Sequence, residues 1–503
     1  VRLIVERERE INEFVSEAAF RVIANFILPD GTTVLKAELN RRLKDKKEVE
    51  AFLESCKNAS FTIDDITTKP VKKSPAPPFT TSTLQQEAAR KLGYSVSQTM
   101  MIAQRLYESG LITYMRTDSV NLSEFATIGS KDAIIKMMGE RYVHPRHFET
   151  KTKGAQEAHE AIRPTNIRYT PAELKDSLSR DQFRLYQLIW KRFTASRMSA
   201  AVYETTSVKI DAGNHRFTVA ASKLAYDGFM SVYRDDEDEK QESNTLVKDI
   251  TKDTQLKLSE FEPKQHFTQP PAHYTEASLV KTLEELGIGR PSTYAPTIST
   301  IITRRYVAKE NKNLYMTELG EVVNNIMKQS FASIVDVNFT AYMEGLLDMI
   351  AEGKVEWKSV ISNFYPDLKE AVEKAEKELE TVKIEDEVTD VVCEECGRNM
   401  VIKYGPHGKF LACPGFPECR NTKPYLEKIG VACPKCGKDI VLKKTKKGRK
   451  YYGCENNPEC EFMSWQKPAG INCEKCGSFM VEKGNKIVCS NTQCGHVIEK
   501  EKK

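Results

Sequence analysis

The 503-residue sequence has no apolar run near the ~20 residues that a membrane-spanning helix requires, and its mean hydropathy is −0.49. No segment has the layout of a signal peptide. Cysteine is almost absent from the first 387 residues, where Cys56 stands alone. These absences exclude a membrane protein and argue for a reducing compartment. A hydrophobic fraction of 40% and a charged fraction of 29% exclude a wholly disordered chain, and the length predicts several domains.

The other twelve cysteines fall in three groups of four that begin every 40 residues. Each group opens with C-x-x-C-G, in which the glycine permits the tight turn that points two sulfurs at one centre. Four thiolates at this spacing suit tetrahedral zinc, whereas the alternative of a disulfide framework lacks any sign of secretion. The predicted ligand groups are Cys393, Cys396, Cys413 and Cys419; Cys433, Cys436, Cys454 and Cys460; and Cys473, Cys476, Cys489 and Cys494.

Basic residues gather in the same C-terminal region. From residue 388 onward there are 21 Lys and Arg against 13 Asp and Glu, whereas the preceding part has a net charge of −4. Three four-thiolate zinc sites would lower the charge of this tail from +8 to about +2, so its basicity has to act locally. Aromatic residues lie near the lysines, and Tyr451 and Trp465 are candidates for stacking on single-stranded nucleic acid. The alternatives are that the charges only keep the tail soluble and that the rings only fill small cores.

Hydrophobic periodicity divides the rest of the sequence into helical and β-rich parts. Lys69–Phe79 is rich in proline and is predicted to be a linker or hinge, and residues 235–245 a solvated loop. The helical block lies between two β-rich segments, which we expect to form one discontinuous domain. The predicted helical parts are 2–19, 83–197 and 276–383, and the predicted extended parts are 20–39 and 206–258.

Three short segments carry side chains with possible chemistry. Gly110–Ser119 (GLITYMRTDS), read as extended, places four side chains on one face: Ile112, Tyr114, Arg116 and Asp118. A tyrosine beside an arginine and a carboxylate could attack a phosphate that the arginine holds, although such a tyrosine more often serves packing.

The other two segments are weaker signals on their own. Ala155–Thr165 (AQEAHEAIRPT), read as a helix, places His159 and Arg163 on one face, and the alternative is an ordinary surface helix. In Thr275–Ala295 (TEASLVKTLEELGIGRPSTYA) two glycines end a helix. The donors that follow could bind a phosphate near the start of the next helix: Arg290, Ser292 and Thr293.

Taken in order, these segments resemble the motifs of bacterial DNA topoisomerase I, the type IA family, almost residue for residue, and the resemblance extends over the whole chain. The fold class that it implies is multidomain α+β, a torus of helical domains with a discontinuous β-rich hinge domain, followed by three zinc ribbons. The implied activity is ATP-independent relaxation of negatively supercoiled DNA through transient cleavage of one strand. The expected domains are 1–10, the end of a helical gate-base domain; 11–79 with 201–271, the hinge domain; 80–200, the helical domain with Tyr114; 272–387, a helical DNA-binding domain; and 388–427, 428–467 and 468–503, the ribbons.

The resemblance also implies roles for single residues. Tyr114 matches the tyrosine that attacks a phosphodiester of single-stranded DNA and forms a 5′-phosphotyrosine. Arg116 matches the arginine that holds the scissile phosphate, and two residues match positions that organise the site and handle protons: Asp118 and His159. DNA contacts are expected from Arg163, Arg290, Ser292, Thr293 and Arg304, and from Tyr451 and Trp465 of the ribbons.

Members of this family begin with a Toprim domain whose acidic residues bind Mg²⁺, and the sequence contains no such motif. We therefore expect the chain, which starts at Val1, to be a piece of a longer protein and to be inactive alone. The alternatives are a non-catalytic, single-stranded-DNA-binding zinc-ribbon protein and a decatenating type IA relative. The expected partners are single-stranded and negatively supercoiled DNA, with RNA polymerase as a further candidate, and the expected setting is a monomer in a bacterial cytoplasm.

Overall fold

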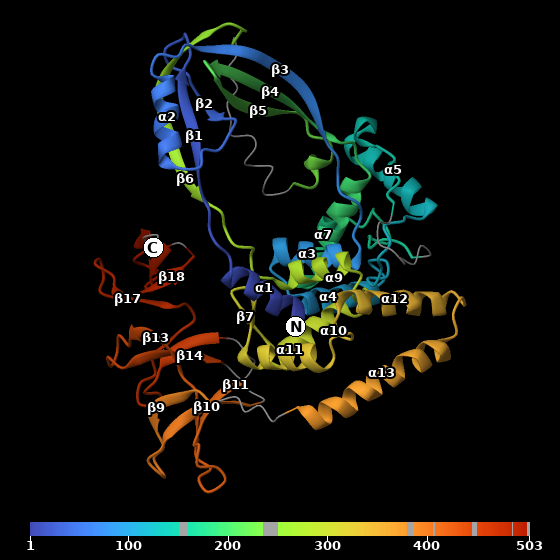
Figure 1. Ribbon diagram of the computed structural model, residues 1–503, viewed down its shortest axis with the longest axis vertical. Coiled ribbons are helices and arrows are strands. Elements are labelled where there is room, and N and C mark those ends of the chain that lie inside the picture. The colour runs from blue at the N-terminus through green and yellow to red at the C-terminus, as the bar shows by residue number, and fades with distance from the viewer. Residues whose placement is uncertain are drawn as a thin grey trace. The chain divides into compact units, whose positions relative to one another are not determined.

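The computed structural model divides the chain into two compact units, Val1–Val382 and Lys383–Lys503. It describes residues 1–149, 159–234, 250–379, 386–405, 408–444, 450–484 and 486–499, so the loop expected at 235–245 lies outside the described residues. Figure 1 shows both units, the first in blue to light orange and the second in dark orange to red. Within the described ranges, no helix is both long enough and apolar enough to cross a membrane.

The β-rich part of the first unit is a closed six-stranded barrel with the strand order β1-β2-β5-β4-β3-β6. Alternate side chains point inward, as the alternation in the sequence requires, and Phe26, Ile63 and Phe217 are fully buried there. Two segments far apart in the sequence therefore share one core. The elements are β1 (Ala18–Ile27), β2 (Val34–Leu39), α2 (Lys46–Cys56), β3 (Phe61–Lys73), β4 (Ala201–Ala212), β5 (His215–Tyr226) and β6 (Gln255–Phe267). The short helix η2 (Gly228–Ser231) follows β5 and packs in the core of the helical block.

Two antiparallel strand pairs continue out of the barrel (Figure 1). Strands β3 and β4 pair as far as Lys73 with Ala201, and β1 and β6 pair as far as Ala18 with Phe267. The prediction of a linker at Lys69–Phe79 is therefore wrong for its first part, because cross-strand bonds to β4 hold residues 69–73 in β3. Pro70 is tolerated since β3 pairs with β6 only at its first residues, which leaves one edge of β3 open at the proline.

The helical block between β3 and β4 agrees with the prediction. Serine or threonine side chains cap its helices, because each hydroxyl accepts a backbone N–H that the first turn leaves unpaired. Leu84, Leu106, Tyr186 and Phe193 lie in its core. The elements are α3 (Thr81–Leu92), α4 (Val96–Glu108), α5 (Glu124–Met138), η1 (Glu140–Tyr142), α6 (Pro171–Leu174) and α7 (Arg180–Ser196).

Helices α1, α9 and α10 share another core, which contains Ile4, Val280 and Ile298. Helix α1 ends earlier than predicted, because residue 18 already pairs with β6. Helix α9 packs against α3, which brings the segment 275–295 next to the helical block. The elements are α1 (Arg2–Asn12), α9 (Glu276–Glu285), α10 (Tyr294–Thr303), β7 (Val307–Glu310), β8 (Asn313–Met316), α11 (Glu318–Ser330), α12 (Val337–Ala351) and α13 (Trp357–Glu378).

The second unit contains three four-stranded antiparallel sheets, each with one cysteine group, so the repeat of cysteines is a repeat of the fold. Ribbon 1 contains β9 (Val388–Val392), β10 (Asn399–Gly405), β11 (Gly408–Ala412) and β12 (Thr422–Pro424). Ribbon 2 contains β13 (Glu427–Ala432), β14 (Asp439–Lys444), β15 (Lys450–Cys454) and β16 (Met463–Ser464). Ribbon 3 contains β17 (Pro468–Asn472), β18 (Phe479–Lys483), β19 (Lys486–Cys489) and β20 (Val497–Glu499).

Candidate active site and zinc centres

Tyr114 lies in a loop that hydrogen bonds fix on both sides. On one side, the Thr113 N–H donates to the Arg163 carbonyl (2.9 Å) and the Thr113 hydroxyl donates to the Ala161 carbonyl (2.7 Å). The Thr165 N–H donates to the Leu111 carbonyl over 3.0 Å. The residues just before Tyr114 are therefore tied to segment 161–165.

On the other side, the loop is tied to the start of α3 by Thr81, which is fully buried. The Thr81 hydroxyl donates to the Met115 carbonyl (2.7 Å) and accepts from the Thr117 N–H (2.9 Å). The Thr81 N–H donates to the Thr117 carbonyl over 2.8 Å. Nothing in the sequence motif pointed to Thr81, whose run of hydroxyl residues reads only as a helix cap.

The local conformation differs from the extended strand that we expected. Ile112 and Met115 are both buried, so the side chains do not alternate between two faces. Tyr114 is 41% exposed. Its ring forms T-shaped pairs with the rings of Tyr107 and His159, with ring centroids 5.3 Å and 6.4 Å apart. Packing of Ile112 in the helical core overrides the short alternating pattern and leaves the Tyr114 ring at the surface.

Four residues predicted from two segments nevertheless meet at one cavity of about 290 Å³. Its lining includes Tyr114, Arg116, Asp118 and His159, together with Arg290, Ser292 and Asp348 from the other helical part. The Arg290 guanidinium donates to Asp348 Oδ2 over 2.6 Å and lies 3.8 Å from Glu344 Oε2. The cavity thus combines a partly exposed phenol, two arginines, an imidazole and carboxylates.

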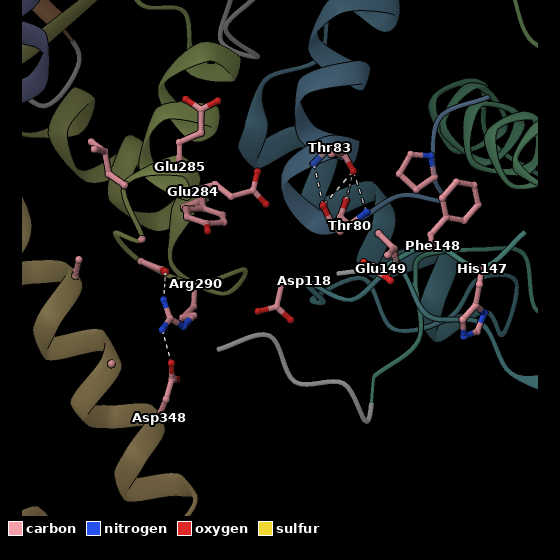
Figure 2. Close-up of a pocket in the computed structure, with 18 residues that line it drawn as sticks. Thr80, Thr83, Asp118, His147, Phe148, Glu149, Glu284, Glu285, Arg290 and Asp348 are labelled. Atoms are coloured by element: carbon pink, nitrogen blue, oxygen red, sulfur yellow. Dashed lines mark hydrogen bonds and ion pairs between the residues drawn. The ribbon is translucent and has the colours of Figure 1, made fainter. Parts of the chain in front are cut away.

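A larger cavity of about 1260 Å³ adjoins this one and shares Asp118, Arg290 and Asp348 with it (Figure 2). Glu284 lines it from the end of α9, and the Ser82 hydroxyl donates to Glu284 Oε2 over 2.7 Å. Burial, together with the nearby charge of Asp118, raises the pKa of the Glu284 carboxyl, although the bond from Ser82 opposes the shift. Sequence reasoning missed Glu284 because its partners lie in distant segments.

The expected helix at 155–165 is wrong for its described part. Residues 155–158 lie outside the described residues, and residues 159–165 are irregular, with isolated bridges from Ile162 to Phe79 and from Pro164 to Ile112. Pairing with these two core residues pulls the segment out of a helical conformation.

Arg163 is buried, which does not fit a direct contact with DNA. Its guanidinium donates to Glu160 Oε2 (2.6 Å) and to the Pro164 carbonyl (3.0 Å). Although burial opposes the change, hydrogen bonds from Ser123 and the charge of Arg163 lower the pKa of Glu160. The pair therefore holds the segment that fixes Thr113.

The other expected DNA contacts lie in or near α10. Thr293 precedes α10, and its hydroxyl accepts from the Arg290 N–H (2.9 Å), so it shapes the glycine-rich turn. Gly289 has a φ of +79°, and a Cβ there would lie 2.9 Å from the Thr293 hydroxyl, which explains the glycine. Ser292 is exposed at the smaller cavity, whereas the exposed Arg304 at the end of α10 lines neither of the two cavities.

Each ribbon brings four cysteine sulfurs within 4.8 Å of one another. The nearest sulfur pairs are 3.2–3.7 Å apart, for example 3.7 Å between Cys393 and Cys419. These separations exceed the ~2.05 Å of a disulfide and approach the ~3.8 Å edge of a tetrahedral zinc–thiolate site. At Cys436, a hydrogen bond from the backbone N–H of Lys438 lowers the pKa of the thiol to about 7. The geometry fits three zinc ions.

The aromatic candidates of the tail lie together on ribbon 2. The rings of Tyr451 and Trp465 are 6.0 Å apart, and Trp465 is 46% exposed. Tyr451 pairs with Lys443 across β14 and β15. The basic residues 445–449 lie outside the described residues.

Comparison with known proteins agrees with this architecture. A family model described as DNA topoisomerase matches residues 1–362, and a model described as the topoisomerase DNA-binding C4 zinc finger matches 390–428 and 430–469. The solved structure of full-length topoisomerase I from Thermotoga maritima is 35% identical, with a TM-score of 0.65 over 88% of this chain and 70% of that chain. The chain therefore belongs to the bacterial topoisomerase I family of type IA DNA topoisomerases, enzymes that relax DNA.

The described residues do not fit the magnesium site that the family resemblance implies. Among them, the three cysteine groups are the only clusters of three or more side chains placed to share a metal ion. The carboxylates near Tyr114 are instead engaged elsewhere, since Asp348 binds Arg290 and Glu284 accepts from Ser82. The described residues around Tyr114 therefore offer no magnesium site.

Proposed function

We propose that Tyr114 is the nucleophile with which this topoisomerase cleaves one DNA strand. The observation that supports the proposal is the meeting of Tyr114, Arg116, Asp118 and His159 around one cavity. The phenol is accessible while its loop is held on both sides, and this combination keeps a nucleophile in a fixed position without burying it.

In the proposed step, Tyr114 Oη forms a bond to the phosphorus of a phosphodiester in single-stranded DNA while the bond to the 3′ oxygen breaks. The phenol loses its proton and the 3′ oxygen gains one, so the strand ends in a 3′-hydroxyl and a 5′-phosphotyrosine. The reverse reaction reseals the strand without ATP, because the ester is exchanged rather than hydrolysed.

The neighbours of Tyr114 have separate roles in this proposal. Arg116, which is exposed beside it, pairs with the non-bridging phosphate oxygens and stabilises the developing negative charge. His159, at the edge of the Tyr114 ring, carries the proton, and Asp118 balances the charge of the site.

The DNA backbone on one side of the scissile phosphate is proposed to contact Arg290, Ser292 and Thr293. Arg290 is held by Asp348 and Glu344, so an incoming phosphate would compete with these carboxylates for the guanidinium. A contact from Arg304 stays a prediction.

We further propose that the substrate is negatively supercoiled DNA with single-stranded stretches, on which the enzyme acts as a monomer in a bacterial cytoplasm. Rings beside lysines on ribbon 2 support single-strand binding. The predicted need for Mg²⁺ in religation and a contact with RNA polymerase stay predictions.

Substitution of the nucleophile tests the proposal. In the complete protein, with a Toprim domain present, Tyr114→Phe is expected to abolish the covalent adduct with a labelled oligonucleotide on a denaturing gel. Binding should fall less than about twofold because many phosphate contacts remain. Tyr107→Phe is a matched control, since its ring touches Tyr114 and is similarly exposed. The assignment of Tyr114 as the nucleophile would be refuted if Tyr114→Phe still formed the adduct, or if the adduct were lost in Tyr107→Phe and not in Tyr114→Phe.

A further inference from the structure

The three ribbons differ in the groups that could hold nucleic acid. Residues 428–467 contain ten Lys and Arg against four Asp and Glu, whereas residues 468–503 contain six against four and residues 388–427 five against five. Ribbon 3 has one aromatic residue, Phe479. Single-stranded DNA is held by cations along the backbone and by rings under the bases, so ribbon 3 has little of either.

The single ring of ribbon 3 is directed at ribbon 2. Phe479 packs edge-to-face against Phe462 with ring centroids 5.1 Å apart. It belongs to the hydrophobic cluster of ribbon 2, while the cluster of ribbon 3 is built around Met480. A second contact lies nearby, where Gly470 comes so close to Val431 that a Cβ on the glycine would be 3.5 Å from both methyl groups.

This contact lies on the face of ribbon 2 opposite the exposed ring pair. Successive side chains of a strand point to opposite faces, so Tyr451 and Tyr452 of β15 face opposite ways. Tyr452 packs in the same cluster as Phe462 and Phe479. Tyr451 pairs with Trp465, away from that cluster.

We infer that ribbons 2 and 3 form one binding module for single-stranded DNA. Ribbon 2 contacts the DNA, and ribbon 3 packs against the face of ribbon 2 opposite Tyr451 and Trp465 and stabilises it. The support matters because ribbon 2 has a very small core, built from three of its cysteines with Ile440 and Phe462. Adding Phe479 to this core holds β15, which contains Tyr451, and β16, which Trp465 directly follows. The inference rests on the proposed single-strand binding by ribbon 2.

The test measures binding of the full chain to a fluorescent oligothymidylate at several salt concentrations. Phe479→Ala is expected to weaken binding about three- to tenfold, as loss of an aromatic contact would, although Phe479 does not face the DNA. Phe479→Leu keeps an apolar side chain in the core of ribbon 2. Its affinity for the oligothymidylate is expected to lie between those of the wild type and Phe479→Ala. The zinc content should remain at three ions per chain in both variants, which shows that ribbon 3 still folds.

Matched variants separate the possible outcomes. Lys483→Gln with Lys486→Gln removes ribbon 3 charges and is expected to leave affinity and salt dependence unchanged. A flatter salt dependence would mean that ribbon 3 binds DNA directly and would overturn the inference.

Trp465→Ala tests the proposed function itself, because unchanged affinity would mean that ribbon 2 does not bind by stacking. If Trp465→Ala weakens binding and Phe479→Ala does not, only the supporting role is wrong. When Trp465→Ala is already present, Phe479→Ala should weaken binding less than it does alone, because both changes act on the same ring pair, Tyr451 and Trp465.

Discussion

At the scale of single residues, the hydroxyl group of Thr81 fixes one side of the Tyr114 loop. It makes bonds to the backbone on both sides of Arg116. Thr81→Val keeps the shape but leaves these buried groups unpaired at a cost of about 1–3 kcal/mol. Because a displacement of ~1 Å can cost ~100-fold in rate, we expect the rate of adduct formation to fall at least ~10-fold while DNA affinity stays constant.

Two further variants make this measurement specific. Thr81→Ser retains the hydroxyl and should restore the rate of adduct formation. Thr99→Val removes an equally buried hydroxyl that bonds only the Ser95 carbonyl within its own helix, so it should leave the rate unchanged. Equal rates for Thr81→Val and wild type would show that the loop keeps its place without this residue.

Glu284 predicts a dependence of stability on pH. Its pKa is raised in the folded protein by burial and by Asp118, so the folded state holds the proton more tightly than the unfolded chain. Unfolding then releases a proton, and stability falls as the pH rises from the ordinary pKa of 4.5 through the raised value. Glu284→Gln should therefore raise the melting temperature at neutral pH, with a gain that shrinks as the pH falls toward 4.5. A gain that is constant with pH would contradict the assignment to Glu284.

At the scale of elements, the ribbons depend on their metal. Each has a hydrophobic cluster of only a few residues, several of them cysteines, and structural zinc supplies ~10–16 kcal/mol in such domains. Elemental analysis should find three zinc ions per chain. A strong chelator should make residues 388–503 sensitive to protease while Val1–Val382 keeps its thermal transition. One zinc or none in metal-replete protein would rule out the three sites.

The elements also show where sequence reasoning works and where it fails. The cysteine groups were predictable because four ligands within one local repeat specify a site without long-range contacts. The irregular segment 159–165 was not, because Ile162 and Pro164 are held by bridges to residues that a local pattern cannot include. The strand across Pro70 was missed for a similar reason, since its partner β4 lies far along the chain.

Only part of the candidate site was predictable from the sequence. Tyr114, Arg116 and Asp118 were predictable from one motif, and they do line one cavity. Their surroundings were not, because Thr81, Glu284 and Asp348 come from other elements. Thr81 bonds the loop at Met115, Glu284 accepts from Ser82 where α9 packs against α3, and Asp348 accepts from Arg290.

At the scale of the whole first unit, polar contacts join the helical block to the helices that follow residue 272, and one of them is a 2.6 Å hydrogen bond between the hydroxyls of Ser97 and Ser299. Side chains this close suit a disulfide. In the complete protein with a Toprim domain, Ser97→Cys with Ser299→Cys should, after oxidation, block plasmid relaxation and leave oligonucleotide cleavage intact, if strand passage requires these parts to separate. Reduction should restore relaxation. Wild-type protein treated with the same oxidant is the control for oxidation of the ribbon cysteines. Full relaxation activity of the cross-linked protein would show that the Ser97–Ser299 contact does not open.

The fixing of the Tyr114 loop from both sides has a consequence for the topology of the product. A strand end bound to such a tyrosine cannot swivel, because Thr113 and Thr81 prevent the loop from turning. If the 3′-hydroxyl end is held by the protein as well, supercoils cannot unwind in a burst by free rotation about the intact strand. The linking number should change by one for each cycle, and a single plasmid held under torque should lengthen in equal steps whose size does not depend on the torque.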